Sequence, residues 1–313
     1  MLFPVSGVEV NPLIPPLVAF VVSFFTSMGG VSGAFMLLPF QISFLGFTSP
    51  SVSSTNQLFN IVAIPSGVIR YFREGRMVWP LTWVVIVGTM PGVLVGAIIR
   101  VKYLPDPSHF KLFAAAVLLW IGYKLLISLI KKDAEDGKKL TENRFQQLAR
   151  EHRDKKVEGA TLPAVRVLKF SMTRIAYEFY GETYDFSTIG ILALSLAVGI
   201  VGGIYGIGGG SIIAPFFVAI FGLPIYTVAG AALMGTFVTS VAGVAFYQFI
   251  AAYYPTQAIA PDWGLGILFG LGGILGMYCG ARCQKFFPAN VIKWILCGVI
   301  FSTAAKYTIE FFF

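Results

Sequence analysis

Two glycine-rich stretches are the parts of this chain whose residue types best suit chemistry. One spans Gly206–Ser211 with the sequence GIGGGS, and the other spans Gly29–Gly33 with the sequence GGVSG. Each leads into a short apolar run, 34–47 or 211–222. A helix that begins in such a run presents backbone N–H groups without intrahelical partners, and its dipole adds positive potential there. The pattern therefore predicts an oxyanion site that needs no full positive charge.

Neutral polar side chains in the neighbouring apolar runs are suited to complete this site. We expect the substrate-binding residues to be Ser32, Gly33, Thr55, Asn56, Gln57 and Asn60 from the first half of the chain, and Gly208, Gly209, Gly210, Ser211, Thr236, Thr239 and Ser240 from the second. Asn60 and Thr236 occupy equivalent positions when the halves are aligned. The competing interpretation is that the glycines only permit close helix packing, while the polar groups bond neighbouring helices.

Groups for catalysis are missing from the apolar runs. The chain has two histidines, His109 and His152, which are far apart in sequence. Asp106, Asp262 and Glu310 lie at or near the ends of apolar runs, and no Asp or Glu lies inside one. Metal sites and acid–base pairs need such groups to converge. We therefore expect no enzyme activity, no catalytic residue, no metal and no cofactor.

Composition indicates that these runs lie in a membrane. Hydrophobic residues make up 56% of the 313 residues and charged residues 12%, with a mean hydropathy of +0.77. Soluble chains usually carry about 25% charged residues. The net charge of +8 does not indicate nucleic acid, because basic residues outside 131–185 stand singly between apolar runs. The first residues have no basic stretch and no cleavage site, so we expect no removable signal peptide.

Hydrophobic segments divide the chain into two similar halves around a charged insert. Each half opens with two short runs separated by the glycines and continues with three runs long enough to span a bilayer. The long runs are 51–72, 79–100, 108–130, 226–251, 262–281 and 289–312, and the short ones are 13–28, 33–47, 187–205 and 208–222. We predict an all-α polytopic membrane protein with about 10 hydrophobic segments. Its first transmembrane repeat is 1–130, its insert 131–186 and its second repeat 187–313.

The two halves align without a gap when 29–71 is placed on 205–247. Glycines and prolines coincide in this alignment, among them Pro39 with Pro215. Farther along, glycines spaced by four residues coincide as well, Gly88, Gly92 and Gly96 with Gly272, Gly276 and Gly280. This spacing is typical of helices that pack closely in membranes. Each short pair either crosses twice or returns as a re-entrant hairpin, so each half makes an odd number of crossings and we predict inverted repeats.

Charge distribution predicts the orientation of the halves. Arg73 and Lys285 lie in loops that should be cytoplasmic, whereas 252–261 carries no charge and should be external. The insert is then cytoplasmic, and both termini are external. Three basic residues fall on the external side and count against this orientation: Arg100, Lys102 and Lys111.

The insert combines two kinds of sequence. Residues 131–158 carry dense charges of both signs, which is typical of a solvated helix or a flexible segment. Helical spacing over 162–180 gives an apolar stripe made of Val165, Leu168, Met172, Ile175 and Phe179. We predict an amphipathic interfacial helix there. Such a helix serves either as a linker on the membrane body or as a regulatory, partner-binding element.

At these residues the chain resembles the TauE/SafE sulfite exporter family, also called the toluenesulfonate uptake permease family. The resemblance rests on Gly206–Ser211 with Pro215, on Gly29–Gly33 with Pro39, and on Ser54–Gln57, which is similar to an Ala-Thr-Asn-Lys segment of that family. It covers 13–130 and 187–313 and leaves the insert outside. The resemblance implies a carrier of sulfite, an organosulfonate or a related sulfur-containing anion, often an exporter, in the cell inner membrane. Gln57 replaces a common lysine, so no lysine-based contact is carried over.

Two other functions fit the same residues. One is a passive anion channel, whose flux would not saturate. The other is a membrane sensor that signals through the insert. The expected partners are a small sulfur-containing anion and the lipid bilayer, without nucleic acid, and a homodimer stays open.

The absence of carboxylates inside the apolar runs leads to a prediction about pH. Transport should depend on pH only through ionisation of the substrate, because the membrane segments offer no relay for protons. Uptake of sulfite into proteoliposomes should therefore vary near neutral pH, while uptake of a permanently ionised sulfonate should not. Stoichiometric proton movement with the sulfonate would contradict this prediction.

Overall fold

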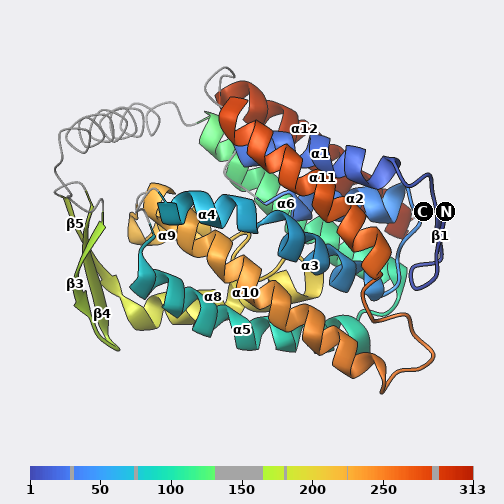
Figure 1. Ribbon diagram of the computed structural model, residues 1–313, viewed down its shortest axis with the longest axis horizontal. Helices are drawn as coiled ribbons and strands as arrows, with labels where there is room; N and C mark the ends of the chain where they lie inside the picture. The colour runs from blue at the N-terminus through green and yellow to red at the C-terminus, as the bar shows by residue number, and fades with distance from the viewer. Residues whose placement is uncertain are drawn as a thin grey trace.

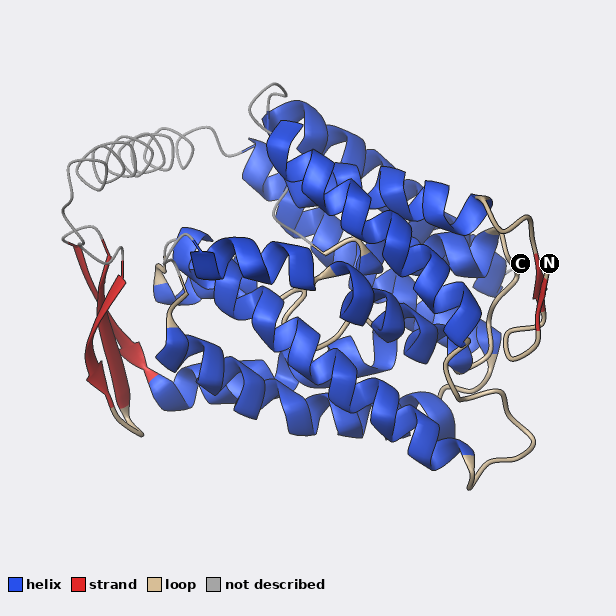
Figure 2. Ribbon diagram, viewed as in Figure 1, coloured by secondary structure: helices blue, strands red, loops and turns tan. Residues whose placement is uncertain are grey.

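The computed structural model describes residues 1–28, 32–73, 77–130, 165–179, 182–223, 225–283 and 289–312. Within these residues the chain is a bundle of helices with a small sheet at each end (Figure 1, Figure 2). The helices are α1 (Ile14–Met28), α2 (Ala34–Ser43), α3 (Ser51–Ala63), α4 (Pro65–Arg73), α5 (Trp79–Lys102), α6 (Pro107–Ile130), α8 (Thr188–Tyr205), α9 (Ala214–Phe221), α10 (Ile225–Ala251), α11 (Trp263–Cys283) and α12 (Ala289–Phe312). The strands are β1 (Leu2–Phe3), β2 (Val8–Glu9), β3 (Val165–Phe170), β4 (Arg174–Phe179) and β5 (Glu182–Ser187).

Several helices have the length and composition of membrane spans. Among the described residues, four stretches qualify: Trp79–Lys102, Thr188–Tyr205, Thr227–Ala251 and Trp263–Gly280, with hydropathies of 2.1, 2.1, 1.7 and 1.5. Their outward side chains are apolar, as expected of a surface that faces lipid; Trp83, Val87 and Leu275 are each more than half exposed. The predicted multi-pass, helical membrane protein is confirmed.

The second short apolar run of each half forms a helix that is too short to cross a bilayer. α2 has 10 residues and α9 has 8. At 1.5 Å per residue they reach about 15 Å and 12 Å, or roughly half of a 30 Å hydrocarbon core. The chain leaves α8 through Gly206, whose φ of 79° is left-handed, and Gly208 has a φ of 76°. Such angles suit glycine, because a side chain would be strained there.

The run 51–72 is not the single helix that its hydropathy predicts. α3 ends at Ala63, and α4 begins two residues later at Pro65. Proline lacks the N–H group that would continue the helical hydrogen bonds, so a break at this position follows from the sequence. Val241 stands at the equivalent place in the second half, and α10 runs through it without interruption.

The glycines spaced by four residues lie where helices touch. α5 packs along α8, and α1 packs along α11. A Cβ added at Gly88 would come within 2.6 Å of Ser195 Cβ, and one added at Gly92 would come within 2.5 Å of the Leu196 carbonyl oxygen. On α11, added Cβ atoms at Gly272 and Gly276 would meet backbone of α1. The predicted close packing at these glycines is therefore present on both α5 and α11.

The two ends of the bundle differ. Figure 1 places the sheet of β3, β4 and β5 beyond one end of the helices and both chain termini near the other end. The residues described in the insert therefore lie on the opposite side of the helical body from the termini. This is the relative arrangement that the charge distribution predicts.

The prediction of an amphipathic helix over 162–180 is wrong within the described residues. Strands β3, β4 and β5 form an antiparallel sheet in that order. Along β4, Ile175, Tyr177 and Phe179 are buried and point to one face, opposite Phe186, Tyr184 and Glu182 of β5. Ile175 and Phe179 fit a helical stripe as well as a strand, but Tyr177 between them fits only the alternation of a strand. The expectation for 131–158 lies outside the described residues.

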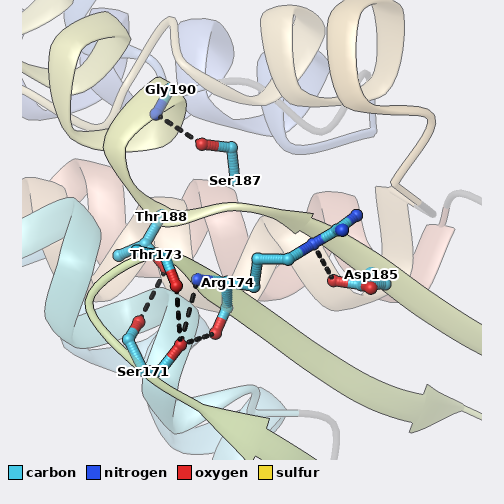
Figure 3. A network of polar contacts seen from close by, with 7 residues as sticks. All are labelled: Ser171, Thr173, Arg174, Asp185, Ser187, Thr188 and Gly190. Carbon is cyan, nitrogen blue, oxygen red and sulfur yellow. Dashed lines mark hydrogen bonds and ion pairs between the residues drawn. The ribbon is translucent and has the colours of Figure 1, made fainter.

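Hydrogen bonds tie this sheet to two helices that continue into the bundle, and Figure 3 shows those at the start of α8. Thr188, the first residue of α8, donates from Oγ1 to the Ser171 carbonyl at 2.9 Å and from its backbone N–H to the Thr173 carbonyl at 3.0 Å. The Ser187 hydroxyl caps the same helix by accepting from the Gly190 N–H. On the other side, the Tyr177 and Thr227 hydroxyls are 2.7 Å apart. Burial raises the pKa of Tyr177, so this phenol keeps its proton.

Helix contact at glycine predicts a large loss of stability when a side chain is added. Gly92→Leu would force apart α5 and α8, because its Cβ would also lie 2.8 Å from the Ile200 amide nitrogen. We expect a loss of about 3 kcal/mol or more, seen as a lowered unfolding temperature or loss of monodisperse protein. Gly298→Leu on α12 is the matched control, since an added Cβ there meets nothing within 4 Å. Equal behaviour of the two variants would contradict the packing argument.

Candidate anion-binding site

Asn60 of α3 joins the two glycine-containing loops in the interior of the bundle. The Ser32 hydroxyl donates to Asn60 Oδ1 at 3.0 Å, and Asn60 Nδ2 donates to the Ile207 carbonyl at 2.9 Å. Asn60 is fully buried, and Ser32 is 3% exposed. Ser32 precedes α2, while Ile207 belongs to the loop that precedes α9. Asn60 therefore lies between Ser32 of the first glycine-rich stretch and Ile207 of the second.

The hydroxyl groups of α10 hold the second loop as acceptors and donate their own protons to carbonyls of α10. Thr239 Oγ1 accepts from the Gly209 N–H at 3.1 Å and donates to the Gly235 carbonyl at 2.7 Å. Thr236 Oγ1 donates to the Ala232 carbonyl at 2.8 Å. Because a hydroxyl has only one proton, neither threonine has a proton left for an anion.

Ser211 also braces the loop. Its hydroxyl donates to the Ile207 carbonyl and lies 3.4 Å from Thr236 Oγ1. Ser240 differs, because its only bond among the described residues is one that it accepts from Asn60 Nδ2 at 3.5 Å. The Ser240 proton is therefore available, and the Ser211 proton is committed.

Backbone N–H groups in the second loop remain without acceptors. Within the described part of the chain, the N–H groups of Gly208, Gly210 and Ser211 donate to no protein group, although all three residues are buried. Most buried backbone donors in proteins are paired. Neighbouring backbone N–H groups without acceptors are the donors from which backbone anion sites are built.

The same loop is packed tightly, as the competing interpretation of the glycines predicts. An added Cβ at Gly208 would lie 2.7 Å from Ser240 Oγ, and one at Gly210 would lie 2.7 Å from Thr236 Oγ1. An added Cβ at Gly209 would collide with Thr89 of α5. Close packing and free donors occur together here, because a residue without a side chain lets the backbone itself face the interior.

Gln57 is a buried amide without any partner. The side chain is fully buried on α3, and neither Nε2 nor Oε1 has a hydrogen bond among the described residues. It packs against Gly243 of α10. Gln57 and Gly243 each lie three residues from Asn60 and Ser240, which places this contact one helical turn along the same interface. An unpaired buried amide costs about 1–3 kcal/mol, which a bound ligand would offset.

The remaining expected site residues have structural partners. Asn56 Nδ2 donates to the Ala34 carbonyl at the start of α2, and Asn56 Oδ1 accepts from Gln41 Nε2. Thr55 Oγ1 accepts from the Asp262 N–H at 2.9 Å, so Thr55 supports the start of α11 instead of joining the cluster. Gly33 lies against Ser23 and Thr26 of α1.

Sequence reasoning missed four polar residues around the site. Gln41 and Ser23 are fully buried, and Gln41 Oε1 and Ser23 Oγ lack partners within the described residues. Thr26 lies beside Gly33, and Thr89 beside Gly209. Each is a lone polar residue in an apolar run, and that pattern is visible in the sequence. The described residues contain no cluster of three or more His, Cys, Asp or Glu that could hold a metal.

Comparison with known proteins gives a family. The family model described as "Sulfite exporter TauE/SafE" matches residues 16–307. The "Probable membrane transporter protein YdhB" of Bacillus subtilis (strain 168) is 27% identical over 122 residues, which is 39% of this chain and 46% of that relative. The chain therefore aligns with less than half the length of that relative. No solved structure matches. Because the family model covers most of the chain, the chain belongs to the TauE/SafE sulfite exporter family.

Proposed function

We propose that this protein is a membrane transporter that carries sulfite, an organosulfonate or a related sulfur-containing anion, as an exporter. The family name and the printed name of the Bacillus subtilis relative support transport. The observation that carries the proposed site is the meeting of two glycine loops at Asn60 beside unpaired backbone donors. Such donors suit an oxyanion, because they concentrate positive potential without a competing full charge.

The roles of the site residues follow from which protons are free. We assign direct contact with the anion to the N–H groups of Gly208, Gly210 and Ser211, the Ser240 hydroxyl and the Gln57 amide. Asn60 positions the loops, because both of its polar atoms are bonded to them. Thr236 and Thr239 support the second loop, and Asn56 supports the start of α2. Hydrogen bonds to a charged partner contribute about 1.5–3 kcal/mol each.

We also propose that the halves are inverted repeats, which would let the site open to either side in turn. The helix contacts support this. The first helix of each half packs on the long helix of the other, α1 on α11 and α8 on α5, and equivalent glycines line both contacts. α6 and α12, the last helices of the halves, pack on each other. A two-fold relation between the halves would produce this reciprocal packing, in which the first helix of each half contacts a long helix of the other.

One observation favours the sensor as a second candidate. The β3–β5 sheet is bonded to α8 through Thr188 and to α10 through Thr227. These two helices lead into the Gly206–Ser211 loop and the hydroxyls that support it. A force on the sheet would therefore reach the site through two helices. Deleting the 131–186 insert would separate the candidates, since transport by the shortened protein argues for a carrier alone.

Gln57→Leu tests the site with two readouts that move in opposite directions. Removing an unpaired buried amide should leave stability equal or higher, because nothing in the protein loses a partner. Removing a ligand contact should weaken anion binding about tenfold to a hundredfold. Titration of purified protein with sulfite, thiosulfate and ethanesulfonate measures the second effect, and thermal unfolding measures the first.

Ser195→Ala is the matched control for this test. Ser195 Oγ on α8 is likewise buried without a partner among the described residues, but it faces Gly88 of α5 instead of the loops. Binding should be unchanged in this variant. Wild-type affinity in a folded Gln57→Leu protein would remove Gln57 from the site.

The inverted arrangement predicts which surfaces face each side of the membrane. In a protein whose three cysteines are replaced, single cysteines at the exposed residues Arg73 and Thr183 should react only from the cytoplasm. A cysteine at Thr256, which is exposed in the loop after α10, should react only from outside. Labelling with a membrane-impermeant maleimide in cells and inverted vesicles measures this. Reaction of Thr183 and Thr256 from one side would contradict the arrangement.

A further inference from the structure

Arg100 is the largest fully buried side chain of the described residues, with an exposure of 0%. It lies near the end of α5 that is remote from the β3–β5 sheet (Figure 1). The sequence places Arg100 among the external basic residues that count against the predicted orientation. Its burial changes that reading, because a guanidinium enclosed by protein is not a loop charge of the kind that sets orientation.

The contacts of Arg100 contain no negative charge. Nη2 donates to the Thr48 carbonyl at 2.9 Å, and Nη1 donates to the Leu104 carbonyl. The guanidinium carbon lies 3.7 Å from the centre of the Phe110 ring. None of the ion pairs among the described residues includes Arg100, whereas Lys111 nearby in sequence is paired with Glu310 at 2.6 Å.

One atom of this guanidinium, and one hydroxyl next in sequence to a residue that it contacts, have no partner among the described residues. Arg100 Nε is buried and donates to no group of the described residues. Ser49 Oγ is also buried and unpaired, and Ser49 directly follows Thr48, whose carbonyl binds the guanidinium. A buried charge is costly unless it is paired. Carbonyl dipoles and an aromatic face reduce that cost, but they leave one N–H donor, one hydroxyl and a full positive charge uncompensated.

We propose that Arg100 and Ser49 form a second anion site, separate from the site at Asn60, that takes a small inorganic monoanion such as chloride. Arg100 Nε and the Ser49 hydroxyl donate to the ion, which also neutralises the guanidinium. The lack of exposure of Arg100 excludes a lipid phosphate, because a headgroup attached to the bilayer would need an open surface. The five fixed N–H donors of arginine allow two carbonyls and an anion to be bound at once.

This site is connected to the loop that precedes α9. Tyr247 of α10 packs with Ala97 and Val101, which lie within one turn of Arg100 on α5, and its hydroxyl donates to the Gly203 carbonyl of α8 at 3.2 Å. Gly203 lies one turn before Gly206, where α8 ends. Occupancy of the Arg100 site would therefore stabilise the end of the helix that carries the Gly206–Ser211 loop.

Chloride dependence of stability tests the proposal. Thermal unfolding of the purified full-length protein is measured in sodium chloride and in sodium gluconate at equal ionic strength. The unfolding temperature of the wild type should rise with chloride concentration, because a ligand that binds only the folded state stabilises it. Arg100→Gln should abolish this rise, and Ser49→Ala should shift it to about tenfold higher chloride. Lys102→Gln, at an exposed residue of the same helix end, should keep it.

The outcomes distinguish a chloride site at Arg100 from a purely structural arginine and from chloride bound elsewhere. A guanidinium that serves only as a strut between carbonyls would make Arg100→Gln less stable by the same amount in both salts. Chloride binding at Asn60 instead would make the rise sensitive to Gln57→Leu and insensitive to Ser49→Ala. Bromide provides a direct check, since its anomalous signal should lie within hydrogen-bond distance of Arg100 Nε. If Arg100→Gln does not fold, the Ser49→Ala titration and the bromide position decide, and bromide density elsewhere alone overturns the proposal.

Discussion

Direct contact between helix backbones at glycine is the constraint on which the rest of this structure depends. In a bilayer, apolar side chains gain nothing by leaving lipid for protein, so helices associate through close packing and hydrogen bonds. Gly199 and Gly203 of α8 meet the backbone of Thr89 and Val93 on α5, and Gly206 meets the backbone of Ser53 on α3. These contacts fix the end of α8 between α3 and α5. The loop that follows is therefore held in the interior, where its residues are buried.

Some polar side chains around that loop support it, and others are left free for the proposed anion. Thr239 and Ser211 spend their protons on carbonyls of the protein, and so do not compete for an anion. Asn60 is bonded at both polar atoms and fixes the distance between the loops. Within the described residues, the donors left free there are neutral, namely backbone N–H groups, the Ser240 hydroxyl and the amide of Gln57. Because each supporting group bonds to the loops or to the helix that carries it, the donors of the proposed site keep defined positions.

The fold was predictable where one physical signal dominated. Hydropathy located the membrane helices, and glycine spacing located their contacts, because both depend on residue type alone. Pro65 indicates a helix break, but the apolar run 51–72 continues through it and predicts a single helix. The sequence does not separate a helix from the β3–β5 sheet at Ile175 and Phe179, which satisfy both periodicities, and the alternation through Tyr177 becomes decisive only with its pairing to β5. At the site, residue types indicated Asn60, but they could not show that Thr236 uses its proton within α10 or that Thr55 supports α11.

The two proposed sites differ in charge, and this charge determines the free-energy cost of leaving each site empty. An empty site at Gln57 leaves a neutral amide unsatisfied, at a cost of about 1–3 kcal/mol. An empty site at Arg100 leaves a full charge in a medium of low dielectric, where the effective penalty is several kcal/mol. A carrier must release its substrate in every cycle, so a neutral site suits a ligand that comes and goes. A buried guanidinium suits an ion that stays, and its fixed position at the end of α5 suits a structural role better than a place on the transport path.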